Sequence, residues 1–185
     1  IYTIGGTNPD FIDFTEAVTV LNAAGVTGPV TFRVRDGYYD EQVVIGKING
    51  VDKDNPILFE GESGDSTKAV LRYNMDNNIL DYALSLNGAQ FFTFKNLGFE
   101  RDRNDRTVAI ASDASNISFQ GCHFFSFQKI WGKNLNNVRL VNNHIRSTIE
   151  IEKSNLVWIE GNYCNQYIIF SNENDSIFFL NNHLN

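Results

Sequence analysis

Five segments in the second half of the chain repeat one order of apolar and polar positions. Their first residues are 25, 21, 19 and 20 positions apart, and they read FTFKNLGF (92–99), ISFQGCHF (117–124), VRLVNNHI (138–145), VWIEGNYC (157–164) and IFFLNNHL (177–184). The first and third positions of each segment are apolar, which is the alternation of a β-strand with one buried face. A period near twenty residues is too short for helical repeats and is typical of one coil of a β-solenoid.

Only asparagine and glycine occupy the fifth position of these segments: Asn96, Gly121, Asn142, Gly161 and Asn181. These two residue types enter the left-handed backbone region most readily, so we predict a tight bend there between two strands. The sixth position is expected to face inward, and it is asparagine in the last three segments. Because stacked strands lie about 4.8 Å apart, Asn143, Asn162 and Asn182 are predicted to hydrogen-bond as an amide ladder.

A third apolar strand precedes each segment. Counting back ten residues from the third position gives Leu84, Ala109, Ile130, Ile149 and Ile169. Three short strands per coil, with bends between them, describe a parallel β-helix. The predicted fold class is therefore all-β, a parallel β-helix of about seven coils.

The first part of the chain predicts an amphipathic helix over residues 14–24. Residues 13–16 (DFTE) resemble a capping box, and apolar residues follow at helical spacing as far as Leu21. We expect this helix to cover the first coil, because the end of a solenoid otherwise exposes its core. Residues 30–72 then form the first coils, and residues 83–185 form the regular coils, of a single β-helix domain spanning 1–185.

The two chain ends predict a larger context. No capping element follows the last repeat, and the chain opens on Ile1 rather than Met. We therefore expect a fragment of a longer protein that is followed by further coils, or an end-to-end homodimer.

Composition narrows the classes of function. A net charge of −7 argues against a nucleic-acid partner, because phosphate binding needs clustered Lys and Arg. No apolar stretch approaches the ~20 residues of a membrane span. The two cysteines, Cys122 and Cys164, do not make a disulfide framework or a zinc site, and we interpret them as small buried hydrophobic residues.

Residues 14–45 resemble the start of the pectin-lyase-like right-handed β-helix superfamily. There a cap helix is followed by a strand, an Asp-Gly-x-Tyr turn and a Glu-x-Val-x-Ile strand, which stand here at residues 36–39 (DGYY) and 41–45 (EQVVI). With residues 83–99 (ALSLNGAQFFTFKNLGF) added, the resemblance covers nearly the whole chain. Its start is similar to β-helix modules of large secreted bacterial surface proteins. The resemblance implies that the fold is a right-handed parallel β-helix and that the protein is secreted or lies at the cell surface. Its motifs are specific for the fold and weak for activity.

Enzymes of this superfamily use particular acidic residues. Pectin methylesterases carry a catalytic Asp in an Asp-Phe-[Ile/Val]-Phe-Gly strand that this sequence lacks, and pectate lyases cluster Asp and Glu around calcium. Their chemistry usually lies on the outward face of the first strand of each coil. On that face the one acid/base group here is Glu150 and Glu152 next to Lys133. A catalytic role for these three residues and a solvated salt-bridge cluster both remain open.

Aromatic residues gather at outward positions towards the C-terminus. Trp131 and Phe170 are expected on the outer face of one set of strands, and Trp158 and Phe178 on that of the next. An exposed apolar patch normally marks a contact. These four residues are therefore candidates for stacking on sugar rings or for packing against a further domain or subunit.

No metal site or cofactor is predicted. His123 and His144 occupy the outward seventh position of adjacent coils, but Tyr163 interrupts the column and no carboxylate shares it. A surface calcium at acidic loop residues stays an open alternative, and none of these loops shows an EF-hand or nonapeptide calcium pattern. These residues are Asp52, Asp54, Asp65, Asp102 and Asp105.

Three functions are consistent with this pattern. The first is a non-catalytic module of a secreted or cell-surface bacterial protein, serving as a rigid spacer or as a polysaccharide-contacting surface. The second is a polysaccharide lyase or hydrolase of pectate-lyase or pectinesterase type, acting on acidic glycans. The third is an assembly module that pairs through its open C-terminal end.

Overall fold

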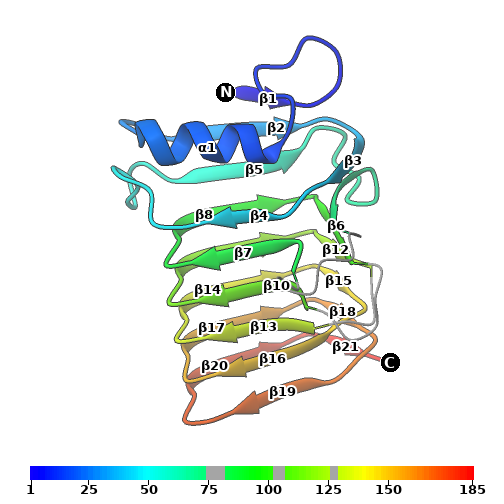
Figure 1. The fold of residues 1–185 in the computed structure, drawn as a ribbon. Helices are drawn as coiled ribbons and strands as arrows, with labels where there is room; N and C mark the ends of the chain where they lie inside the picture. Colours follow the sequence, from blue (N-terminus) through cyan, green and yellow to red (C-terminus); the bar gives the residue numbers. More distant parts are fainter. Residues whose placement is uncertain (74–81, 102–106, 126–128) are drawn as a thin grey trace.

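The computed structural model describes residues 1–73, 82–101, 107–125 and 129–185, and the chain forms a stack of coils with three parallel sheets along its sides (Figure 1). The eight-stranded sheet contains β1 (Tyr2–Ile4), β2 (Val30–Val34), β5 (Ile57–Gly61), β8 (Gln90–Lys95), β11 (Ser115–Gln120), β14 (Asn136–Val141), β17 (Asn155–Glu160) and β20 (Asp175–Leu180). The six-stranded sheet contains β4 (Val43–Ile45), β7 (Leu84–Asn87), β10 (Thr107–Ser112), β13 (Lys129–Lys133), β16 (Thr148–Glu152) and β19 (Ile168–Ser171). The seven-stranded sheet contains β3 (Gly37–Asp40), β6 (Ala69–Tyr73), β9 (Gly98–Arg101), β12 (His123–Phe124), β15 (His144–Ile145), β18 (Tyr163–Cys164) and β21 (His183–Leu184).

Each coil contributes one strand to each sheet. Within the described residues, six coils carry all three strands, and β20 and β21 begin a seventh. The predicted fold class, an all-β, right-handed parallel β-helix with three strands per coil, is confirmed. The helix α1 (Phe14–Ala24) begins and ends at the predicted residues.

The core is a column of stacked side chains between the three sheets. Phenylalanine fills it in the first coils, where the ring of Phe59 lies 4.7 Å from that of Phe32 and 5.7 Å from that of Phe94. Phe94 in turn lies 5.0 Å from Phe119. Further along, aliphatic residues such as Ile159 take the same inward position. The apolar first and third positions of the repeats are thus interior positions, as predicted.

The bends between the eight-stranded and seven-stranded sheets have the predicted geometry. The backbone angle φ lies between 53° and 64° at all five predicted residues: Asn96, Gly121, Asn142, Gly161 and Asn181. This is the left-handed region, in which glycine and asparagine pay the smallest steric cost. The fifth position of the repeat is therefore occupied by the residues that the bend requires.

The predicted asparagine ladder is present and buried. The Nδ2 of Asn143 donates to the Oδ1 of Asn162 at 2.9 Å, and the Nδ2 of Asn162 donates to the Oδ1 of Asn182 at 2.9 Å. Each rung also accepts a backbone N–H from the coil before it, as when Asn143 N–H donates to Asn162 Oδ1 at 2.8 Å. The side-chain oxygens therefore accept backbone N–H groups that would otherwise be buried without an acceptor at the bend.

A second inward ladder, which sequence analysis missed, lies at the bend between the six-stranded and eight-stranded sheets. The N–H of Leu135 donates to Ser154 Oγ at 3.0 Å, and the N–H of Ser154 donates to Asn174 Oδ1 at 2.9 Å. The equivalent residues in earlier coils are Ala89 and Ala114, so this position of the repeat reads as apolar in the sequence. Only the spatial alignment of the coils reveals the polar rungs.

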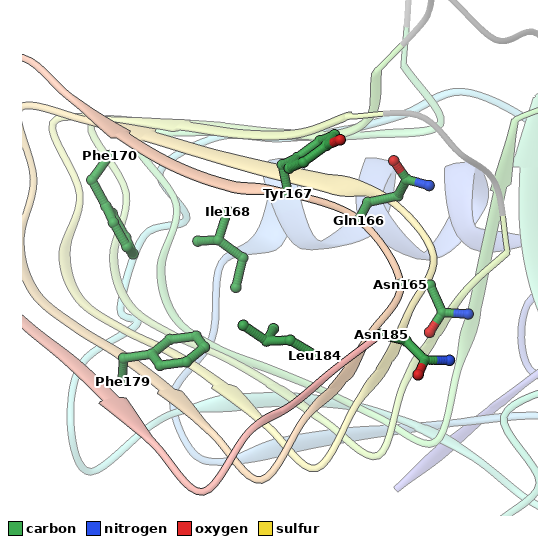
Figure 2. Close-up of a pocket in the computed structure, with 8 residues that line it drawn as sticks. All are labelled: Asn165, Gln166, Tyr167, Ile168, Phe170, Phe179, Leu184 and Asn185. Carbon is green, nitrogen blue, oxygen red and sulfur yellow. The ribbon is translucent and has the colours of Figure 1, made fainter.

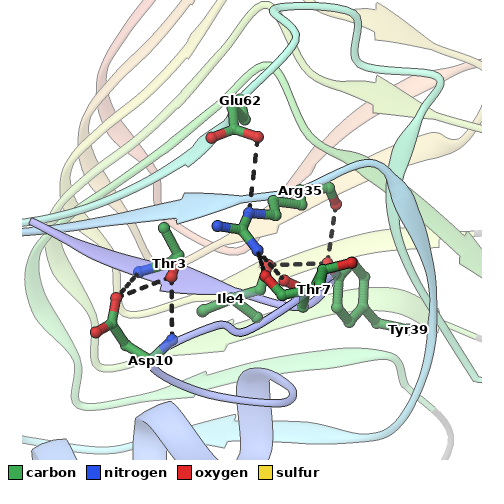
Figure 3. Close-up of polar contacts among 8 residues, drawn as sticks. Thr3, Ile4, Thr7, Asp10, Arg35, Tyr39 and Glu62 are labelled. Atoms are coloured by element: carbon green, nitrogen blue, oxygen red, sulfur yellow. Dashed lines mark hydrogen bonds and ion pairs between the residues drawn. The ribbon is translucent and has the colours of Figure 1, made fainter.

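The N-terminal end of the solenoid is closed by α1 and by the loop that precedes it. Asp13 Oδ1 accepts the N–H of Glu16 at 2.8 Å, so the predicted cap is confirmed. In return, Glu16 Oε2 accepts the N–H of Ile12 at 2.7 Å. The guanidinium of Arg35 binds the carbonyl oxygens of Gly5 and Thr7, and Thr3 and Asp10 bond across the base of the loop (Figure 3).

Tyr39 connects the N-terminal strand, the turn after β2 and α1 at the same end of the solenoid. Its hydroxyl lies 2.8 Å from Arg35 O and 3.1 Å from Ile4 O (Figure 3), and its ring packs edge-on against Phe14 of α1. Burial raises the pKa of the Tyr39 phenol to about 12. The phenol therefore stays a hydrogen-bond donor throughout the neutral pH range.

The last complete coil differs from the prediction by one residue. β19 pairs Ile168 with Ile149 and Phe170 with Ile151, so the inward residues are Ile168 and Phe170 rather than Ile169. The turn after β19 contains two left-handed residues, Asn172 and Glu173, where the preceding coil has one, Lys153. Because of this extra turn residue, the inward residue of β19 lies eleven positions before Phe179, where the earlier coils have ten positions between the equivalent residues.

Candidate functional site

The outer face of the six-stranded sheet gathers four of the predicted site residues. Lys129, Trp131 and Lys133 alternate with inward residues along β13, and β16 places Glu150 beside Trp131 and Glu152 beside Lys133. Trp131 is partly buried between its neighbours. The parallel register thus brings one indole ring, two lysines and two carboxylates onto adjacent strands.

Both carboxylates of this group are ion-paired across the strands. Lys129 Nζ lies 2.5 Å from Glu150 Oε2, and Lys133 Nζ lies 3.7 Å from Glu152 Oε1. Asn172 Nδ2 also donates to the second oxygen of Glu152 at 3.1 Å. A general acid or base must exchange a proton with the substrate, and these oxygens already hold cations and an amide. The arrangement is therefore suited to binding more than to proton transfer.

Trp158 and Phe178 lie on a different sheet from Trp131. They occupy adjacent positions on the outer face of β17 and β20, with ring centroids 3.9 Å apart and planes inclined by 11°. On the other side, the guanidinium of Arg139 lies 5.1 Å from the Trp158 ring centroid. Because both faces of the indole are in contact, Trp158 offers its edge to a ligand, while Phe178 keeps one face towards the C-terminal end.

The orientation predicted for Phe170 is wrong. The shifted register of β19 turns Phe170 inward and leaves Ile169 at the outward position beside Glu150. Phe170 belongs instead to the C-terminal end of the solenoid, where Ile168, Phe170, Phe179 and Leu184 project into one space (Figure 2). The four predicted aromatic contacts therefore belong to three separate surfaces.

This C-terminal end is an open depression of about 490 Å³. Phe170, Phe179 and Leu184 are 42%, 40% and 57% exposed, whereas Cys164, one coil earlier in the column of Leu184, is 1% exposed. The inward columns of the repeat thus end on an apolar surface.

The outward histidines stack and show no metal site. The rings of His123 and His144 lie 4.4 Å apart, and Phe125 stacks on His123 at 4.0 Å. Burial, followed by the positive charges of His144 and Arg146, lowers the pKa of His123 to about 4. Among the described residues, no group of three or more His, Cys, Asp or Glu side chains could hold a metal ion.

The acidic loops contain local turn contacts. Asp52 Oδ1 accepts the N–H groups of Asp54 and Asn55, and Asp65 Oδ1 accepts the N–H and hydroxyl of Thr67. Asp102 and Asp105 lie outside the described residues. Calcium binding at these loops stays a prediction.

Both cysteines are buried and free, as their interpretation as hydrophobic residues requires. Burial raises the pKa of Cys122 to about 12 and that of Cys164 to about 11. The thiolate form that a nucleophile needs is therefore disfavoured. In the part of the chain that the structure describes, no helix has the length and apolar character to cross a membrane.

Three parallel sheets, with one strand of each in every complete coil, and a helix near the N-terminus define the fold as a right-handed parallel β-helix. Solved structures that are similar to this chain include pectin methylesterases. The enzyme from Aspergillus niger has a TM-score of 0.57 and 13% identity, over 99% of this chain and 85% of that chain. The enzyme from carrot has a TM-score of 0.58 and 12% identity, over 97% and 82%.

A third similar structure is a pectin methylesterase in complex with a hexasaccharide, with a TM-score of 0.54 and 10% identity over 88% of this chain and 70% of that chain. No protein-family model and no curated protein matches the sequence. At these identities the likeness shows the fold alone, and the activity must be argued from the side chains of this chain.

Proposed function

We propose that this chain is a non-catalytic, polysaccharide-contacting β-helix module of a secreted or cell-surface bacterial protein. Its contact surface is the outer face of the six-stranded sheet around Trp131. The observation that carries the proposal is the pairing of Glu150 and Glu152 with Lys129 and Lys133 beside a partly buried indole. A flat aromatic ring flanked by charged and amide groups suits a sugar ring, which has apolar faces and a polar rim.

The charge balance of the surface around Trp131 supports a neutral or weakly charged glycan as the ligand. The two lysines and two glutamates around Trp131 balance in formal charge, while the whole chain carries −7. A strongly anionic polymer would be repelled by the net charge unless a cation intervened. The hexasaccharide complex of a similar fold supports an oligosaccharide as the kind of ligand.

A second candidate function is a pectinesterase-like activity on acidic glycans. The observation that favours it is the likeness of the fold to pectin methylesterases over most of their length. In this case Glu150, Glu152 and Lys133 supply the acid/base groups, and at least one ion pair must open when substrate binds.

One set of measurements separates these functions. The wild-type chain is screened on a glycan array and assayed for reducing ends, unsaturated products and methanol release from methylated pectin. We expect binding without turnover, and Trp131→Ala should weaken binding about tenfold. Tyr38→Ala, which removes an exposed aromatic on the seven-stranded sheet, is the matched control and should bind as wild type.

Two outcomes contradict the proposal. Turnover that is lost in Glu150→Gln or Glu152→Gln would establish the second candidate function. Binding that survives Trp131→Ala but is lost in Trp158→Ala would move the contact surface to the eight-stranded sheet.

A further inference from the structure

The C-terminal end of the solenoid combines an apolar surface with two hydrogen-bonding ladders of fixed polarity. In the first ladder, the backbone N–H of each rung donates to the side-chain oxygen of the next rung towards the C-terminus. The bonds run from Cys122 to Asn143 at 2.8 Å, from Asn143 to Asn162 at 2.8 Å and from Asn162 to Asn182 at 2.9 Å. The backbone N–H of each rung therefore needs a side-chain acceptor in the coil that follows it.

The second ladder has the same polarity. Leu135 N–H donates to Ser154, and Ser154 N–H donates to Asn174. The last donors of the two ladders are thus the N–H groups of Asn174 and Asn182, and no described residue accepts from either of them. Asn174 lies in the turn between β19 and β20, and Asn182 in the bend between β20 and β21, so both belong to the last strands, which also carry the exposed side chains of Phe170, Phe179 and Leu184.

We propose that this end is a docking surface for one further three-stranded parallel coil that presents a side-chain oxygen at each ladder position. The two acceptors of that coil lie eight residues apart, as Ser154 and Asn162 or Asn174 and Asn182 do. Its inward residues are apolar and cover Phe170, Phe179 and Leu184. Asn, Asp or Ser supplies the oxygen, since each carries an acceptor on a short side chain.

The polarity of the ladders selects this occupant over a second copy of the chain. Two copies that meet at their C-terminal ends bring ladder donors from both sides and no ladder acceptor. Leaving such N–H groups buried without partners costs about 1–3 kcal/mol each. A head-to-tail arrangement meets α1, the residue 5–12 loop and a depression of about 430 Å³ beside them, because only β1 precedes the first complete coil among the described residues.

The test extends the chain by one coil and follows single amides. A second copy of residues 166–185 is appended after Asn185, which preserves the register, because Asn185 and Asn165 make the same backbone bond to the coil before them. We expect the amide hydrogens of Asn174 and Asn182 to exchange with solvent at least tenfold more slowly than in the unextended chain.

The matched control is the same extension with Asn174→Leu and Asn182→Leu introduced in the appended copy only. It can bury the apolar surface but offers no acceptor, so the two reporter amides should exchange at least tenfold faster than in the extension that carries the asparagines. Equal protection in extension and control would overturn the proposal.

Two further measurements keep the outcome decisive if the appended coil does not fold. A second extension uses residues 147–165, whose ladder positions are Ser154 and Asn162. If neither extension protects Asn182 while the internal amide of Asn162 stays protected, the proposal is overturned. Sedimentation of the unextended chain should show a monomer, and a dimer in which Asn182 becomes protected would assign the surface to a second copy.

Discussion

Asparagine performs two different tasks at neighbouring positions of this chain, and the direction of the side chain decides which one. Asn142 bends the backbone with φ of 53° and points outward, while Asn143 points inward and bonds to Asn162. The bend column also alternates between asparagine and glycine for a spatial reason. A β-carbon on Gly121 would lie 2.7 Å from Asn96 Oδ1, and one on Gly161 would collide with Asn142 Oδ1. Asn96 and Asn142 therefore occupy the space that a side chain at the glycine of the following coil would need.

This packing predicts a coupled pair of substitutions. Gly161→Ala should lower the free energy of unfolding by about 2–3 kcal/mol, because alanine is strained at positive φ and meets the Asn142 amide. Combining it with Asn142→Gly removes the collision and should recover at least about 1 kcal/mol. Urea unfolding of the two single variants and the double variant measures the coupling, and strictly additive costs would refute the steric explanation.

His123 predicts a pH dependence of stability. Its pKa is lowered to about 4 in the folded chain by burial and then by positive charge, against about 6.5 when unfolded. Between these values the unfolded state binds more protons, so the free energy of unfolding falls as the pH falls from about 6.5 to 4. After allowance for partial solvent exposure, we expect a loss of at most about 2 kcal/mol.

The measurement compares wild type with His123→Gln at pH 7 and pH 4.5. Carboxylates such as Asp40, whose pKa the Arg72 hydrogen bond lowers, also lose stabilisation in acid, but they do so in both proteins. The difference between the two proteins should therefore shrink towards low pH. A pH-independent difference, or a His123 ring that titrates near pH 6.5 by NMR, would disprove the assignment.

At the scale of elements, the cap helix shows how a local signal is completed by a distant residue. The residue pattern of 13–24 predicts α1 without help, since the Asp13 cap and the apolar spacing are local. The N-terminus of α1 is nevertheless bound by Glu41, which follows β3. Glu41 accepts the N–H of Phe14 at 2.9 Å, and the N–H of Thr15 at 2.7 Å. A carboxylate at this position satisfies free N–H groups and complements the helix dipole.

Glu41→Ala should therefore destabilise the chain by about 2 kcal/mol, because two N–H groups of the first helical turn lose their acceptor. Asp36→Ala is the matched control, since Asp36 is an exposed acidic residue in the same coil, and it should cost less than about 0.5 kcal/mol. Thermal or urea unfolding checks both values. Equal effects in the two variants would show that Glu41 does not hold the helix.

At the scale of the whole molecule, the two ends of the solenoid are unequal. The first coils pack under α1, with Phe14 stacked on Phe59 at 5.6 Å, and the central coils are covered on both sides. The last strands β19, β20 and β21 have a neighbour on one side only within the described residues. In a solenoid each coil contacts only its neighbours, so local stability follows the number of covered sides.

Amide exchange should consequently be graded along the axis. We expect the amides of β14 and β17 to exchange at least tenfold more slowly than those of β20, measured by NMR in the unextended chain. Uniform protection from β14 to β21 would show that the end surface is already covered in solution. If raising the protein concentration slows amide exchange in β20 and β21 only, the chain self-associates through this end.

The sequence by itself determined the features that depend on neighbours along the chain. The alternation of apolar positions set the strands, the Gly/Asn column set the bends, and residues 13–24 set the cap helix, because each signal is contained within a few residues. Even the asparagine ladder was predictable, since rungs one period apart stack whenever the coil length is constant.

Only the tertiary structure decided what depends on the register between coils. The extra residue in the turn after β19 turned Phe170 from the outer face of the sheet to the inward column that ends on the C-terminal surface, and counting residues in the sequence could not locate it. The pairing of Glu150 with Lys129, the separation of Trp158 from Trp131 onto another sheet, and the second ladder are likewise contacts between residues far apart in sequence. A shift of one residue reverses the direction of every side chain in a strand, so the site residues were the least predictable part of a fold whose architecture was predictable almost completely.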